Sequence, residues 1–182
     1  MNEVYQEVQS RLQITKGSAN RYLLALLCLS LCSCVHTKET NPGRKENVNT
    51  YKKDVVLWYE AFEKKDPALL DRILSKEWID IPPAPNQPAG PDGAKQILTE
   101  LGTTFPDLKI KIEDILQDGD KVVVRSTITG TQRGTLIGFP AKGRAMSIQA
   151  IDIHEFRDRR IVRTWHTEDW MNGLHQLGVF EK

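Results

Sequence analysis

The chain has 182 residues, of which 40% are hydrophobic and 27% are charged, so it is long enough for one domain with a sizeable core and too short for two ordinary ones. Its 25 lysines and arginines are nearly balanced by 24 aspartates and glutamates, which leaves a formal net charge of +1. This balance excludes the broad basic field that is typical of a nucleic-acid-binding protein.

The cysteines lie together in one apolar segment near the amino terminus, at positions 28, 32 and 34, and the remainder of the chain has none. This distribution excludes a disulfide framework, a cysteine zinc site and a thiol nucleophile in the folded domain. The apolar run is roughly ten residues long, whereas a membrane-spanning helix needs about twenty. Basic residues precede it and small residues end it, which is the layout of a signal peptide.

The end of this segment, Leu31-Cys32-Ser33-Cys34, resembles the bacterial lipobox, in which the last cysteine is acylated and becomes the mature amino terminus. We therefore expect residues 1–34 to be a lipoprotein-type signal peptide, Cys34 to carry the lipid, and residues 35–46 to form a polar spacer. The protein would then be anchored to a membrane of the bacterial cell envelope, on the outer-membrane side where there are two membranes. The alternative is a buried amphipathic helix or an uncut membrane anchor.

Helical periodicity begins where the folded domain, residues 47–182, is expected to start. An apolar stripe recurs at helical spacing along the first helix, at Tyr51, Val55, Trp58 and Phe62. Asp66 and Pro67 then provide the N-cap and the first turn of a second helix that ends near Leu74. A short extended piece, residues 78–81, precedes a proline-rich stretch, and a third helix follows it.

From residue 108 onward apolar residues alternate with polar ones, which is the period of a half-buried strand. Hairpin turns are expected at 118–120 and 158–159, and a short helical end closes the chain. Strands are expected at 108–112, 122–131, 146–156 and 161–170. This order predicts the α+β class, with three N-terminal helices on one face of a curved, four-stranded antiparallel sheet. Such a sheet closed by helices leaves a hollow in which a ligand can bind.

The last hairpin separates the candidate site residues by face. If Asp158 and Arg159 form the turn, His154 is expected to pair with Arg163. One face then carries aromatic, acidic and basic side chains together, namely Asp152, His154, Phe156, Ile161, Arg163, Trp165, Thr167 and Asp169. The opposite face carries Ile151, Ile153, Glu155, Val162, Thr164, His166 and Glu168. We expect the first face to line the hollow.

A carboxyl group beside Trp165 in an apolar hollow should have its pKa raised by desolvation, as a general acid or base near neutral pH requires. Asp169 is therefore the candidate acid/base, and His154 could orient or share its proton. The candidate substrate-binding residues are Trp165, Asp152, Phe156, Arg163, Thr167 and Trp58. The alternative is that the charged residues of this hairpin are solvated cross-strand pairs. The histidine spacing matches no standard zinc pattern, so no metal site is expected.

Short motifs follow one another in order through the domain: Phe105-Pro106-Asp107, Asp118-Gly119-Asp120, Gly130-Thr131, Trp165 followed four residues later by Asp169, and Gln176-Leu177-Gly178. On these residues, the chain from roughly Asn47 to Gly178 resembles the SnoaL-like polyketide cyclase (ester cyclase) family of the NTF2-like superfamily. The resemblance implies a cone made of a curved sheet and three helices. It also implies a homodimer, because dimers formed through the outer face of the sheet are common in the superfamily.

Cyclases of this family close a ring by intramolecular aldol condensation without a metal or a cofactor. The resemblance matches Asp169 to the acidic residue that moves the proton and His154 to a pocket histidine. It therefore implies an ester cyclase-type enzyme acting on a small apolar carbonyl compound. Two alternatives remain: a hydrolase or isomerase on the same scaffold, and a non-catalytic pocket that binds a small apolar ligand or a partner at the cell envelope.

Overall fold

The computed structural model of the protein describes residues 50–181. The predicted signal peptide, the lipidated cysteine Cys34, the spacer and the predicted domain start at residue 47 lie outside the described residues. Within residues 50–181, no helix is both long enough and apolar enough to cross a membrane.

Four helices lie in the first half of the described part of the chain. They are α2 (Thr50–Asp54), α3 (Val56–Lys64), α4 (Pro67–Ile73) and α5 (Pro91–Thr104). The single helix predicted from Tyr51 to Phe62 is divided into α2 and α3 at Val55. The Asp66 side chain caps α4 by accepting a hydrogen bond from the backbone N–H of Ala68, at 3.0 Å, and Pro67 opens its first turn, as predicted.

A mixed sheet of five strands follows the order β1-β5-β4-β3-β2. Its strands are β1 (Leu74–Ile81), β2 (Lys109–Asp118), β3 (Lys121–Thr131), β4 (Ala145–Arg157) and β5 (Arg160–Glu168). The two predicted hairpin turns are present, and the short helix α6 (Trp170–Gln176) ends the fold. The α+β class is therefore confirmed.

The predicted sheet lacked one strand. The segment that we interpreted as the end of a helix and a short extended piece is a full strand, β1, which pairs in parallel with β5. A parallel partner requires a long crossover connection, and here α5 and three strands separate β1 from β5 in the sequence. Local periodicity does not reveal such a pairing. Because of it, the sheet is mixed rather than wholly antiparallel.

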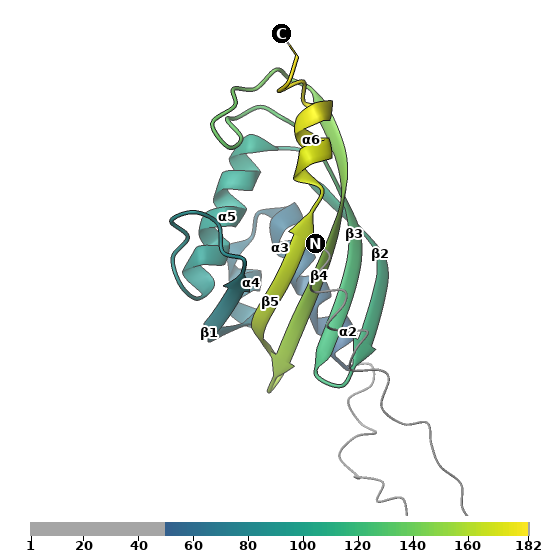
Figure 1. Cartoon of the computed structure of the whole chain (residues 1–182). Coiled ribbons are helices and arrows are strands. Elements are labelled where there is room, and N and C mark those ends of the chain that lie inside the picture. Colours follow the sequence, from purple (N-terminus) through teal and green to yellow (C-terminus); the bar gives the residue numbers. More distant parts are fainter. Residues whose placement is uncertain (1–49, 182) are drawn as a thin grey trace, which may run out of the picture. The chain divides into compact units, whose positions relative to one another are not determined.

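The helices α3, α4 and α5 cover one face of the curved sheet (Figure 1). The side chains between the helices and this inner face form the hydrophobic core. On β3 the inward residues Val122 and Val124 are both 0% exposed, whereas their neighbour Val123 is only half-buried. This alternation is the period of two that the sequence shows, and it fixes which face of each strand points toward the helices.

A β-bulge in the last hairpin decides which residues of β5 point inward. The pairs next to the turn are those expected, with Phe156 opposite Ile161. The next pair is Glu155 with Arg163, so that Val162 is an extra residue without a partner of its own. His154 consequently pairs with Thr164, and the prediction that it pairs with Arg163 is wrong. Because side chains alternate in a strand, this shift of one residue exchanges the two faces of β5 beyond the bulge.

Candidate functional site

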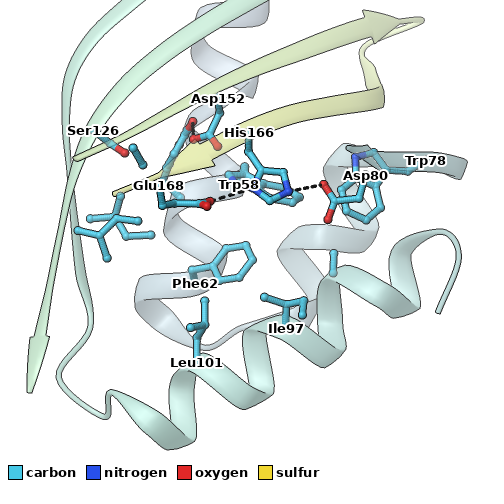
Figure 2. A pocket seen from close by; sticks show the side chains of 15 residues that line it. Trp58, Phe62, Trp78, Asp80, Ile97, Leu101, Ser126, Asp152, His166 and Glu168 are labelled. Carbon is cyan, nitrogen blue, oxygen red and sulfur yellow. Dashed lines mark hydrogen bonds and ion pairs between the residues drawn. The ribbon is translucent and has the colours of Figure 1, made fainter. Parts of the chain in front are cut away.

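A pocket lies between the inner face of the sheet and the helices α3 and α5 (Figure 2). Its cavity volume is about 90 Å³, which is enough for several waters or one small organic molecule. Apolar and aromatic side chains form much of its wall, among them Trp58, Phe62, Trp78, Ile97, Leu101 and Ile110. The pocket therefore suits a compact ligand with a large apolar surface.

Polar side chains gather on the sheet side of this pocket. They come from four strands and one helix, and are Asp80 of β1, Ser126 of β3, Asp152 of β4, His166 and Glu168 of β5, and Tyr59 of the facing helix α3. Figure 2 shows Asp152, Ser126 and Glu168 on the side opposite Phe62, Ile97 and Leu101. A ligand in the pocket thus meets hydrogen-bonding groups on one side and hydrocarbon on the other.

Asp152 is the acid best placed for proton transfer, because it is 7% exposed and borders the pocket. The Tyr59 hydroxyl donates a hydrogen bond to Asp152 Oδ2 at 2.7 Å. Burial raises the pKa of Asp152 to about 6, while the hydrogen bond from Tyr59 favours the charged form and offsets part of that rise. Asp152 can therefore exist as a carboxylate or as an acid near neutral pH, as a general acid/base requires.

A chain of hydrogen bonds extends from Asp152 into the core through Tyr59. The Tyr59 oxygen lies 3.1 Å from His154 Nε2, and His154 Nδ1 lies 3.0 Å from Thr164 Oγ1. Trp78 Nε1, which can only donate, contacts the same Thr164 oxygen at 3.0 Å. Each group is satisfied when Trp78 donates to Thr164, Thr164 to His154, His154 to Tyr59, and Tyr59 to Asp152. This order holds the Tyr59 hydroxyl toward a charged Asp152.

The two histidines of the hairpin have opposite electrostatic environments. His154 is 0% exposed, and desolvation lowers its pKa to about 3, so that it is neutral at physiological pH. His166 lies between two carboxylates, with Nδ1 2.9 Å from Glu168 Oε1 and Nε2 3.3 Å from Asp80 Oδ1, and Nε2 donates a hydrogen bond to the Pro82 carbonyl oxygen at 3.0 Å. The interactions with Asp80 and Glu168 raise the pKa of His166 to about 11. His166 is therefore an imidazolium ion that joins β5 to β1.

The two histidines should change their protonation state at pH values that lie far apart. We expect His154 to stay neutral from pH 8 down to pH 5, because its folded pKa is about 3, and His166 to stay charged up to pH 9. Imidazole nitrogen and carbon NMR shifts measured over this range test both statements, with a His166→Gln variant for assignment. A midpoint near the ordinary value of 6.5 for either residue would contradict this description of the site.

The residues predicted to line the hollow do not all meet there. Asp152 and Trp58 border the pocket, as predicted. His154 shares the inner face but lies behind Tyr59, and Phe156 stacks on Tyr51 with ring centroids 4.6 Å apart. Among the described residues, none of Arg163, Trp165, Thr167 and Asp169 contributes to the pocket wall.

The predicted pocket position of Asp169 is wrong. Its side chain is exposed and caps α6, where it accepts a hydrogen bond from the backbone N–H of Asn172 at 3.2 Å. Arg163 likewise faces away from the cavity, pairing with Glu155 at 2.8 Å and lying 5.3 Å from the centre of the Trp165 ring. The bulge at Val162 is the physical reason, because it turns Thr164, His166 and Glu168 inward in place of their neighbours.

Sequence reasoning missed several polar residues of the pocket, namely Tyr59, Asp80, Ser126, His166 and Glu168. His166 and Glu168 were grouped correctly on a common face, but that face was expected to point away from the hollow. Asp80 requires the parallel pairing of β1 with β5, which has no local signal. Within residues 50–181, no three histidine, cysteine or acidic side chains are grouped so as to hold a metal ion.

Comparison with known proteins gives a consistent result. The model of a family described as SnoaL-like polyketide cyclase matches residues 53–177. TsrD from Streptomyces laurentii is 31% identical, with a TM-score of 0.66, over 70% of this chain and 93% of that one. IdmH from Streptomyces antibioticus, a proposed polyketide cyclase, is 26% identical, with a TM-score of 0.62, over 71% of this chain and 99% of that one.

A SnoaL-like polyketide cyclase from Agrobacterium tumefaciens has the same fold at 19% identity, with a TM-score of 0.61, over 71% of this chain and 98% of that one. No protein among the curated sequences matches this chain.

Proposed function

This chain belongs to the SnoaL-like polyketide cyclase family, and from that premise we propose that it catalyses cofactor-independent acid/base chemistry on a small, largely apolar carbonyl compound. In this proposal the acid/base is Asp152 rather than Asp169. The observation that carries the proposal is a nearly buried carboxyl group that borders an apolar pocket and has a pKa of about 6.

The proposed reaction begins with removal of a proton from the carbon next to a carbonyl group. The Asp152 carboxylate takes this proton, and the electron pair of the broken C–H bond forms an enolate. In an aldol closure, the enolate carbon bonds to a second carbonyl carbon of the same molecule, and the resulting alkoxide takes the proton back from Asp152. The step is balanced without an oxidant or a cofactor, and Asp152 returns to its carboxylate form.

Tyr59 and His154 support this cycle from behind the acid. Because His154 is neutral and fully buried, it neither competes for the proton nor adds a positive charge beside Asp152. Tyr59 donates its hydrogen bond to Oδ2 of Asp152 and not to the other carboxylate oxygen, Oδ1. We propose that Oδ1 exchanges the proton with the substrate, with Tyr59 and His154 acting as positioning residues.

Deuterium uptake tests this function without knowledge of the natural substrate. The full chain is incubated in D₂O with acetophenone or 2-tetralone, and incorporation at the carbon next to the carbonyl is followed by NMR. We expect protein-dependent exchange that rises with pH to half of its maximum near pH 6, because only the carboxylate form of Asp152 accepts a proton. Ile97→Trp, which fills the apolar side of the pocket, should return the rate to the buffer background.

The main alternative is a non-catalytic pocket that binds a small apolar ligand. Such a module needs the cavity but not an acid with a raised pKa. Binding of both ketones without exchange above the buffer background at any pH would contradict the enzymatic proposal and favour this alternative.

The location of the protein is a separate proposal that rests on the sequence alone. We propose that Cys34 is lipidated and that the domain acts at the bacterial cell envelope, because the lipobox-like segment follows an apolar run of signal-peptide length. A homodimer is likewise a proposal drawn from the superfamily.

A further inference from the structure

Ser126 carries a buried hydroxyl group for which the described part of the chain provides no hydrogen-bond partner. The residue is 0% exposed, and its Oγ atom has no donor or acceptor within reach. Buried polar groups in native proteins nearly always have a partner, so an orphaned hydroxyl needs an explanation. Ser126 also borders the pocket, so a group inside the pocket can be that partner.

The sheet register places Ser126 close to the proposed acid/base. Ser126 pairs with Ala150 across β3 and β4, and Asp152 lies two residues further along β4 on the same face. Such diagonal neighbours are about 7–8 Å apart, which one small molecule can span. Ala150 pairs in turn with Glu168 of β5, so this small side chain forms the floor between three polar groups. Figure 2 shows Ser126 on the same side of the pocket as Asp152 and Glu168.

The neighbouring carboxylates do not partner Ser126. Asp152 accepts the Tyr59 hydroxyl through Oδ2, Glu168 pairs with His166 through Oε1, and neither carboxylate forms a hydrogen bond with Ser126 Oγ. The other pocket residues beside Ser126 on the inner face of the sheet are apolar, including Ile110, Ile128 and Ala150. A hydroxyl group can donate one hydrogen bond and accept others, so its natural complement in the pocket is an oxygen atom of a carbonyl or hydroxyl group.

We infer that Ser126 is a specificity-determining residue that binds a second oxygen of the ligand, separate from the carbonyl group on which Asp152 acts. The inference rests on the proposed function for the role of the pocket. It narrows the substrate from any apolar ketone to a carbonyl compound with a further hydroxyl or carbonyl oxygen several bonds away. A buried water bound to Ser126 is the competing explanation, and it predicts no dependence on the oxygen content of the ligand.

Matched probes distinguish these explanations. Acetophenone is compared with 3-hydroxyacetophenone and 4-hydroxyacetophenone, which add one oxygen at two different distances from the ketone. Dissociation constants are measured by NMR titration of the full chain. We expect the better hydroxylated isomer to bind the wild type about 5- to 10-fold more tightly than acetophenone, as one additional buried hydrogen bond would give.

Ser126→Ala should remove this preference and leave the affinity for acetophenone within about twofold of the wild type. Ser147→Ala is the matched control, since Ser147 is an exposed serine on the neighbouring strand β4, and it should keep the full preference. If Ser126→Ala does not fold, Ser126→Cys gives the same test, because a thiol is a weak donor of similar size.

The outcomes separate this inference from the proposed function. A Ser126→Ala protein that still prefers the hydroxylated probe, or a wild type that binds all three probes equally, would overturn the role of Ser126 alone. A wild type that binds none of the probes would count against the ligand pocket and overturn both proposals. Loss of exchange in Asp152→Asn with the hydroxyl preference intact would support each of them independently.

Discussion

Replacing Asp152 with asparagine is expected to slow protein-catalysed exchange of the ketone α-protons at least about 100-fold, the usual contribution of a positioned general base. Asparagine has nearly the same shape, and its side-chain oxygen can still accept the hydrogen bond that Tyr59 donates at 2.7 Å to Asp152. It cannot accept a proton in this pH range. The variant therefore tests the chemistry of the carboxyl group while leaving the packing of the pocket nearly unchanged.

Asp169→Asn is the control for this comparison. Asp169 is exposed and caps α6, and asparagine is as good an N-cap residue as aspartate. We expect this variant to exchange protons at the wild-type rate within about twofold and to fold equally well, since surface changes usually alter stability little. Exchange lost in Asp169→Asn but kept in Asp152→Asn would instead favour the assignment made from the Trp-x-x-x-Asp spacing, and would contradict the pocket described above.

Most elements of the fold could be predicted from sequence because they have a local signal. The apolar stripe of α3, the cap at Asp66 and the alternation in β3 depend on neighbours within a few positions. The strand β1 lacked such support, because its partner β5 lies about eighty positions further along the chain and the pairing is parallel. Topology that depends on distant pairing therefore had to come from the structure.

The candidate site depended on a finer detail than the fold. Asp152 lies before the turn, where inward and outward side chains alternate as the sequence predicts, and the sequence therefore places it on the pocket side. Beyond the turn, the extra residue Val162 reverses the phase, so that His166 replaces Trp165 as a pocket residue. A bulge has no clear signature in a run of β-branched and charged residues. The family resemblance did not correct the error, because its motif includes Asp169 whichever way that residue points.

Replacing His166 with glutamine is expected to destabilise the folded protein by about 3 kcal/mol at neutral pH, because removing one partner of a largely buried ion pair leaves uncompensated charge. The carboxylates of Asp80 and Glu168 lie on either side of the imidazolium, and their side chains are only 12% and 20% exposed. Glutamine can donate hydrogen bonds but carries no charge. The side chain of His166 is itself 23% exposed, and solvent screening there places the expected loss at the lower end of the usual range.

The pH dependence of this loss identifies its origin. The folded pKa of His166, about 11, exceeds the ordinary value of 6.5, so the stabilisation is complete below pH 6.5 and decreases as the pH rises toward 11. Unfolding by urea at pH 6.5 and at pH 9.5 should therefore show a smaller difference between wild type and His166→Gln at the higher pH.

His175→Gln, a change at an exposed histidine of α6, should alter stability by less than about 0.5 kcal/mol at both values. An equal loss for His166→Gln at the two pH values would mean that His166 stabilises the protein by packing alone. The link between β1 and β5 would then not depend on its charge.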